Sequence, residues 1–249
     1  MAKLFRFIFR FDFENGYALV DRPGTVQRTL VDVSPNFWTA VGPSNQAQQI
    51  AATKQNDDRP NRSVCNVTVE LNAISGQIEV EQGIDLVDLY DDEFLKVCDK
   101  ACSSLMETFQ LSKMKRVGAR FLLSGGASDK SIEMRSNYCK AVSKTFVPEK
   151  LLSEISVTDA AIHLIGTMDN DVKYRLVTGP GADDDRRKFF SVIHLSDREI
   201  TETNFGYSVD LDLYQENINF KGTHLLRWLK AKQSHLDRML MIARASAER

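Results

Sequence analysis

The sequence predicts an α+β protein in which antiparallel sheets carry helices packed on one face. Three observations support this class. Residues 3–13 alternate strictly between apolar and polar, later strands come in blocks joined by short turns, and residues 91–111 and 221–245 repeat apolar positions every three or four residues. Since strands come in blocks and do not alternate with helices, a doubly wound parallel sheet is not expected.

The first expected strand, residues 3–13, has two chemically distinct faces because successive side chains of a strand point to opposite sides. Asn15-Gly16 then predicts a turn. One face of this strand is apolar, and its members are Phe5, Phe7, Phe9, Phe11 and Phe13. The other is mostly charged, and its members are Arg6, Ile8, Arg10 and Asp12.

Residues 20–62 carry weaker patterns. Residues 21–24, Asp-Arg-Pro-Gly, predict a turn, and Ser34 followed by proline predicts the start of a short helix. The stretch 44–62 is rich in Gln, Asn and Asp, which is typical of an exposed loop. Alternation at 65–71 and 77–81 then predicts two strands, with their hairpin turn at 73–76.

The helix expected at 91–111 begins with three acidic residues, which suit the positive end of a helix dipole. Its apolar stripe includes Cys98 and Cys102, and buried thiols explain this spacing better than half of a metal site. A strand at 115–123 and a helix at 129–145 follow. The second half predicts four further strands before the C-terminal helix, at 160–168, 172–178, 188–195 and 207–214.

The element order divides the chain into an α+β half, residues 1–125, and a strand meander with a long C-terminal helix, residues 126–249. Each half runs from strands into a helix, so two topologically similar halves are expected, either separate or within one continuous domain.

Composition narrows the function classes. The chain has 249 residues and a formal net charge of −2, so no global attraction to nucleic acid or anionic membranes is expected. No apolar run reaches the length of a membrane span, and charges interrupt the apolar N-terminus, which disfavours a signal peptide. The cytoplasm is the expected location, no cofactor is expected, and no catalytic motif for nucleophilic chemistry is present.

The stretch from Tyr90 to Ser124 carries a helix followed by Arg116-Val117-Gly118-Ala119-Arg120-Phe121. It resembles an uncharacterised, sporadically distributed bacterial protein family of similar length, whose signature strand reads Arg-Val-Gly-Leu-Arg-Tyr. Val209-Asp210-Leu211-Asp212 and the C-terminal helix fit the family's later order, whereas Ala119 and Phe121 depart from its pattern. The resemblance implies no activity; a sporadic distribution would fit a bacterial multi-protein system such as host defence.

Two constellations are candidate sites. Arg6 and Arg10 share a strand face, as do Arg116 and Arg120, and neighbouring strands would gather four guanidiniums into one anion- or nucleic-acid-binding surface. Alternatively, these are solvated faces of one-sided sheets, and some of the arginines pair across strands with Glu70, Glu79 and Glu81. Asp210 and Asp212 share a face of a later strand and could hold a hard cation, although alternating aspartates are also typical of a solvent-facing strand.

These patterns favour a non-enzymatic binding or regulatory module that acts through a protein partner or self-association. A local basic face would also allow nucleic acid to bind. One alternative is a metal-dependent nucleic-acid-processing enzyme that uses Asp210 and Asp212. A second alternative is a structural subunit of a homo-oligomer.

Overall fold

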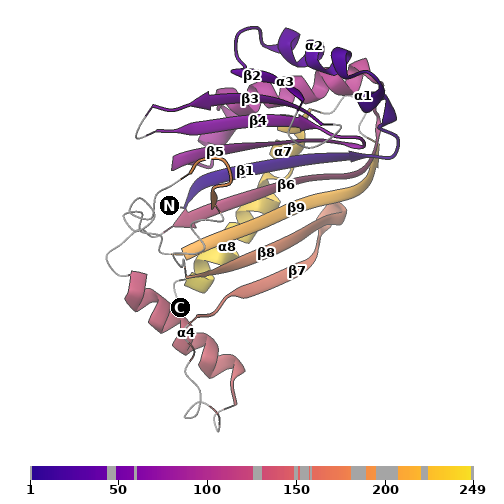
Figure 1. Ribbon diagram of the computed structural model, residues 1–249. Helices are drawn as coiled ribbons and strands as arrows, with labels where there is room; N and C mark the ends of the chain where they lie inside the picture. Colours follow the sequence, from indigo (N-terminus) through magenta and orange to yellow (C-terminus); the bar gives the residue numbers. More distant parts are fainter. Residues whose placement is uncertain are drawn as a thin grey trace.

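The computed structural model describes residues 2–43, 49–58, 61–125, 131–148, 151, 157, 159–180, 189–194, 207–219 and 224–247. Its centre is one antiparallel sheet, which confirms the predicted α+β class (Figure 1). The nine strands are β1 Lys3–Phe13, β2 Ala40–Pro43, β3 Ile50–Asn56, β4 Ser63–Val69, β5 Ala73–Asp85, β6 Lys113–Gly125, β7 Ile162–Met168, β8 Val172–Pro180 and β9 Tyr207–Asn219. The helices are α1 Tyr17–Asp21, α2 Pro23–Val33, α3 Glu93–Thr108, α4 Ser131–Phe146, α7 Leu225–Ala231 and α8 Gln233–Ala247. Two short 3₁₀ turns are η1 Asp88–Tyr90 and η3 Asp169–Asp171.

The strand order β2-β3-β4-β5-β1-β6-β9-β8-β7 places β1 and β6 side by side at the centre. Each of these two strands is followed by helix and then by a run of strands, and the last strand of each run, β5 or β9, returns beside the strand that began it. The segments from β1 to α3 and from β6 to α8 therefore share this topology and meet at the antiparallel pair of β1 and β6. The repeat thus divides before β6, at Lys113, and not after residue 125.

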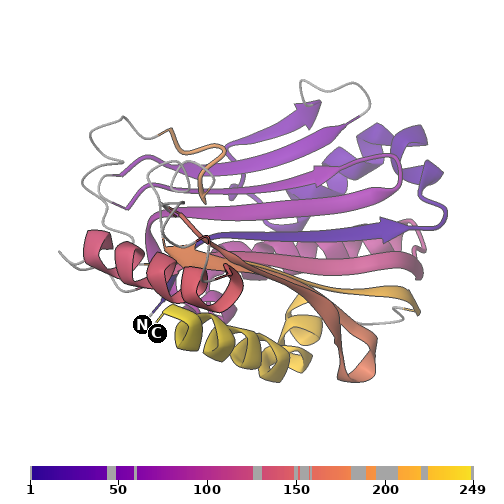
Figure 2. The ribbon, with the colours of Figure 1, turned by 90° about the horizontal axis from the view of Figure 1, so that it is seen from below.

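Helices α3, α7 and α8 cover one face of the sheet, while residues 189–194 cross the other (Figures 1 and 2). The covered face is apolar because strand register brings apolar residues of successive strands into line. One such row crosses seven strands as Leu164, Leu176, Leu211, Phe121, Phe7, Ile78 and Cys65.

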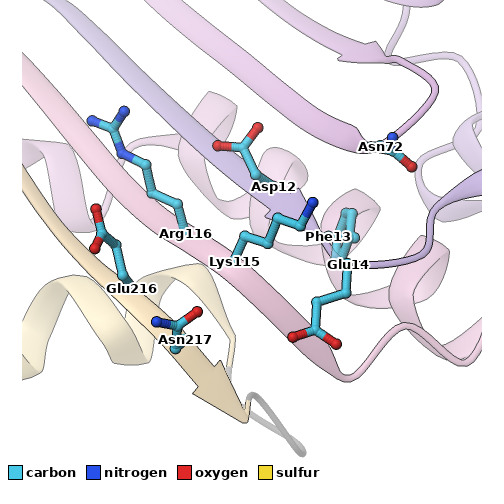
Figure 3. Close-up of a pocket in the computed structure, with 8 residues that line it drawn as sticks. All are labelled: Asp12, Phe13, Glu14, Asn72, Lys115, Arg116, Glu216 and Asn217. Carbon is cyan, nitrogen blue, oxygen red and sulfur yellow. The ribbon is translucent and has the colours of Figure 1, made fainter.

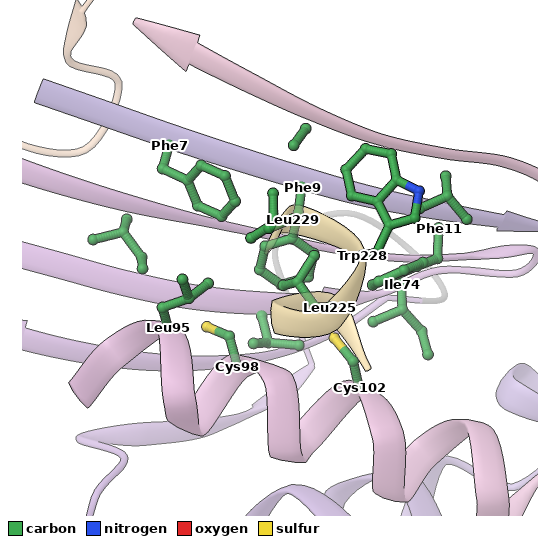
Figure 4. Close-up of a cluster of buried hydrophobic side chains, with 14 of the residues drawn as sticks. Phe7, Phe9, Phe11, Ile74, Leu95, Cys98, Cys102, Leu225, Trp228 and Leu229 are labelled. Atoms are coloured by element: carbon green, nitrogen blue, oxygen red, sulfur yellow. The ribbon is translucent and has the colours of Figure 1, made fainter. Parts of the chain in front are cut away.

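The core between sheet and helices joins segments far apart in the chain (Figure 4). Leu225, Trp228 and Leu229 of α7 pack with α3 and with the phenylalanines of β1. Cys98 and Cys102 are buried free thiols, as their spacing predicts, and Cys98 Sγ lies 3.3 Å from Cys65 Sγ. Within the described ranges, no helix combines the length and apolarity needed to cross a bilayer.

Helix α3 is confirmed but shorter than the expected 91–111, because Asp92 is its N-cap, accepts a hydrogen bond from Leu95 N–H and leaves Glu93 as the first helical residue. The two predictions just before the polar stretch are wrong. Residues 21–24 do not form an isolated turn, since Pro23 opens α2, where a missing N–H costs nothing. Ser34 ends that helix, and Trp38 Nε1–H donates to the Leu30 carbonyl at 2.8 Å.

Four further expectations are corrected. Within the expected loop 44–62, residues 50–56 form β3, because Ile50 and Ala52 bury one face while polar side chains occupy the other; residues 44–48 and 59–60 lie outside the described residues. Residues 73–76 belong to β5, and the hairpin turns at 70–72 instead. The C-terminal helix breaks at Lys232, since α7 packs on α3 while α8 packs on β8 and β9. Where a strand was expected at 188–195, the described residues 189–194 do not form one.

Candidate binding face

The sheet face opposite the helices is strongly polar, and we call it the polar face. It is formed by alternate residues of β5, β1, β6, β9 and β8. One row across it reads Ile165, Arg175, Asp212, Arg120, Ile8, Gln77 and Asn66. Cations and carboxylates alternate along such rows, so the face carries both signs of charge.

The four predicted arginines do lie together on this face, because β1 and β6 are neighbours. Each one pairs with a carboxylate. On β1, Arg6 Nε lies 3.3 Å from Glu79, and Arg10 pairs with Asp12 at 2.7 Å and with Glu70 at 3.1 Å. The surface is therefore a network of ion pairs and not a basic patch.

On β6, Gly118 lies opposite Tyr214 of β9, and Arg116, two residues earlier, stacks on that tyrosine. Its guanidinium is centred 4.2 Å from the Tyr214 ring and donates to Asp212 Oδ2 at 2.8 Å. A Cβ on Gly118 would lie 3.1 Å from the Tyr214 Cβ and 3.6 Å from the Arg116 Nε. Gly118 thus leaves room for Tyr214, on whose ring Arg116 stacks.

Arg120 completes the arrangement with a two-pronged contact, in which Nε and Nη2 donate to the two oxygens of Asp210 at 2.7 and 2.6 Å. The Arg-x-Gly-x-Arg motif of β6 and the Asp-x-Asp motif of β9 are therefore joined by two ion pairs. This pairing gives Asp210 and Asp212 a role other than metal binding. Within the described ranges, no group of three or more His, Cys, Asp or Glu side chains is placed to hold a metal ion.

Electrostatics on this face follow from burial and pairing. The hydrogen bond to Asp210 raises the pKa of Arg120. Burial raises the pKa of Asp212, although Arg116 and Arg120 oppose the shift. Burial lowers the pKa of Arg6, against the attraction of Glu79. The side chains of Arg116 and Arg120 stay 39% and 43% exposed, so their ion pairs face solvent and contribute little to stability.

At one end, the polar face is covered by residues 189–194, which we call the strap. Glu79 on β5 is fully buried beneath it and accepts hydrogen bonds from three consecutive backbone N–H groups, those of Ser191, Val192 and Ile193, at 2.9, 2.9 and 3.0 Å. The Ser191 hydroxyl adds a bond of 2.6 Å. Because the carboxylate takes these donors, the strap does not need a partner strand, which explains why the expected strand is absent there.

An aromatic cluster holds the strap's first residues. Phe189 and Phe190 contact Phe5 edge-on, with ring centroids 5.8 and 6.1 Å apart, and Leu122 joins the cluster. Phe5 was expected on the apolar face with the other phenylalanines of β1. A register shift between Leu4 and Arg6 turns it onto the polar face instead, as β-bulges do.

At the other end, none of the described segments crosses the polar face, and a pocket of about 580 Å³ lies there (Figure 3). Arg116 and Glu216 border it from neighbouring strands, with Asp12 on β1. Lys115 and Asn217 complete its polar rim. Both signs of charge line the pocket, as they do the face as a whole.

Sequence reasoning found the arginines and named Glu70 and Glu79 as possible cross-strand partners, and the ion pairs of Arg10 and Arg6 confirm both. It missed the strap above Glu79 and the position of Phe5. Glu79 has the ordinary polar position of an alternating strand, and its partner lies more than a hundred residues later. No local pattern distinguishes it from Glu81, which pairs with Arg62 at 2.7 Å. The bulge that redirects Phe5 also leaves no local signal, because the phenylalanines recur in the sequence at every second position from Phe5 to Phe13 without interruption.

Comparison of the chain with models of known protein families and with curated proteins finds no match. The resemblance carried by Arg116–Phe121 therefore stays a prediction.

Proposed function

We propose that this chain is a non-enzymatic binding module whose polar face takes a polypeptide partner. The observation that carries the proposal is the strap: the face already binds a peptide segment of its own chain through Glu79 and an aromatic cluster. Backbone N–H groups meeting a carboxylate, with aromatic side chains beside them, is chemistry that a foreign peptide can reproduce on the same surface.

The open end of the face supplies the contacts for such a partner. Arg116 and Arg120 are two-fifths exposed and paired with carboxylates at the surface. An incoming carboxylate can exchange with Asp210 or Asp212 at small cost, since exposed ion pairs are weak. Tyr214 adds an aromatic surface stacked on Arg116. A partner with mixed charge and aromatic residues fits this chemistry.

Nucleic acid fits it less well. The arginines are already neutralised, and the carboxylates among them would repel phosphates. We place the module in the cytoplasm, where buried free thiols persist. In line with the resemblance of its β6 motif, it would serve a bacterial multi-protein system.

The test is selection of peptides from a displayed library on the intact protein, followed by affinity measurement by calorimetry. Arg116→Ala with Arg120→Ala should weaken the selected peptides at least tenfold without changing the melting temperature by more than a few degrees. Arg238→Ala is the matched control, since it removes an exposed, paired arginine from α8. Equal affinity for the double variant, or failure to select any peptide, would overturn the proposal.

A second measurement separates the alternatives. The 260/280 nm absorbance ratio of the purified protein should be that of protein alone; a high ratio that falls with salt would assign the face to nucleic acid instead. Mn²⁺ should leave the melting temperature unchanged. A stabilising shift that Asp210→Ala removes would favour the metal-dependent enzyme.

A further inference from the structure

The two edges of the sheet are protected unequally. Edge strands expose unpaired N–H and C=O groups, and proteins commonly guard them with shortness, proline or charge. β2 has four residues and ends at Pro43. β7 has seven residues, Ile-His-Leu-Ile-Gly-Thr-Met, with no proline and no Asp, Glu, Lys or Arg. In the described part of the chain, only β8 pairs with it.

Several apolar side chains of β7 are only partly buried, as they would be in a strand that lacks a neighbour on one side. Ile165 points to the polar face with 69% of its surface exposed. Leu164 and Met168 point to the helix side and already pack against the core, yet stay only partly buried. The apolar rows of the helix side therefore extend to the edge strand, where their last side chains stay partly exposed.

We infer that β7 pairs antiparallel with β7 of a second copy of this chain, about a two-fold axis through Ile165. The inference is independent of the proposed function, because β7 lies at the sheet edge, away from Arg116 and Arg120. A two-fold axis perpendicular to the sheet keeps both polar faces on one side and both helix layers on the other. The same antiparallel geometry joins the two halves of the chain at β1 and β6.

The register makes a second copy the fitting occupant. About this axis Ile165 faces its own counterpart, His163 faces Thr167, and Leu164 faces Gly166. The absence of a side chain at Gly166 lets the Tyr174 ring lie over it, since a Cβ there would be 2.8 Å from the tyrosine oxygen. Leu164 of each copy thus faces Gly166 and the Tyr174 ring that lies over it in the other copy, an apolar surface without a competing side chain on β7. No like charges oppose each other, since β7 carries none of the four charged residue types.

The expected dimer is modest in size. Seven residues make a strand about 24 Å long, so the joint lies at the small end of specific interfaces and should dissociate on dilution. Equilibrium sedimentation over a wide concentration range should show a mass rising from 28.2 kDa toward twice that value. A monomer at every concentration would overturn the inference.

Two variants test the place of the joint. Ile165→Lys puts two lysines face to face and should keep the protein monomeric at the highest concentration, with its melting temperature retained. Val87→Lys is the matched control, because Val87 is equally exposed at 69% and lies in the segment between β5 and α3, away from β7. A dimer that persists in Ile165→Lys would place the interface elsewhere and overturn the inference.

Cysteine cross-linking tests the register. All four native cysteines are buried, so Ile165→Cys introduces an exposed thiol. With glutathione disulfide as oxidant, Ile165→Cys should form a covalent dimer, since directly opposed Cβ atoms lie within disulfide reach. His163→Cys should not, because the two copies of position 163 lie four residues apart along the joint. Equal cross-linking of both variants, or of neither, would overturn this register.

Discussion

Phe9 and Arg10 are adjacent on β1 but lie on opposite faces of the sheet, in different physical environments. Phe9 is fully buried beneath the helices, where a Cβ on Gly76 would lie 2.4 Å from its ring. The Arg10 side chain is 46% exposed and pairs with two carboxylates that are also partly exposed. The helix-covered face therefore supplies most of the stability, whereas the partly exposed ion pairs of the polar face contribute little.

The sharpest test of this difference compares those two neighbours. Phe9→Ala should lower the free energy of unfolding by about 3–5 kcal/mol, because it leaves a cavity in a close-packed core. Arg10→Ala should change it by less than about 1 kcal/mol, since solvent screens its ion pairs. Urea denaturation measures both. Similar losses for the two variants would remove the distinction between the faces.

Glu79 is the exception on the polar face, and it should behave like a core residue. Glu79→Ala should lower the free energy of unfolding by about 3 kcal/mol. It removes the carboxylate that pairs with Arg6 and leaves three backbone N–H groups of the strap without their acceptor. Glu79→Gln keeps the shape and should cost less. Glu216→Ala, which breaks an exposed pair with Lys173, is the control and should leave urea denaturation nearly unchanged. A neutral Glu79→Ala would mean that the strap is not anchored here.

Alkaline pH should lower the free energy of unfolding through two buried thiols on the helix-covered side of the sheet. The hydrogen bond with Cys65 and burial raise the pKa of Cys98 well above its usual value, and burial does the same for Cys102. Above about pH 8.5 the unfolded thiols lose protons while the folded ones keep them, so stability falls as pH rises. The slope should be about 1.4 kcal/mol per pH unit for each thiol.

A double variant isolates this effect: Cys98→Ala with Cys102→Ala should unfold more easily at neutral pH but lose less stability between neutral and alkaline pH. Urea denaturation at several pH values measures the slope. An unchanged slope in the double variant would assign the alkaline loss to other groups.

The smallest expected effect lies in the motif of β6. Gly118→Val should shift Tyr214 away from Arg116 and cost about 1 kcal/mol, because the new Cβ would lie only 3.1 Å from the Tyr214 Cβ and 3.3 Å from the Leu213 carbonyl oxygen. The Arg116 Nε–H resonance should lose the shift that the tyrosine ring causes. Gly42→Val on β2 is the control, since its Cβ would meet nothing within 4 Å. An unchanged Arg116 resonance would mean that Gly118 has no such role.

Local patterns determined a good part of this protein. The alternation of β1 and β6 predicted which face of each strand is buried, because side chains of a strand point to opposite sides whatever the partner. The spacing of α3 predicted its buried stripe, including Cys98 and Cys102. The same alternation put Arg116 with Arg120, and Asp210 with Asp212, on shared faces.

Tertiary structure alone decided which of these faces meet. Arg120 binds Asp210 across 90 residues of chain, and Glu79 binds the strap across more than a hundred. Nothing local encodes such pairings, since they depend on strand order and on a bulge that redirects Phe5. The same strand order left β7 at an edge. A carboxylate's chemistry is set by its neighbours in space: pairing with arginine makes Asp210 and Asp212 part of an ion-pair network, and burial under the strap makes Glu79 an anchor.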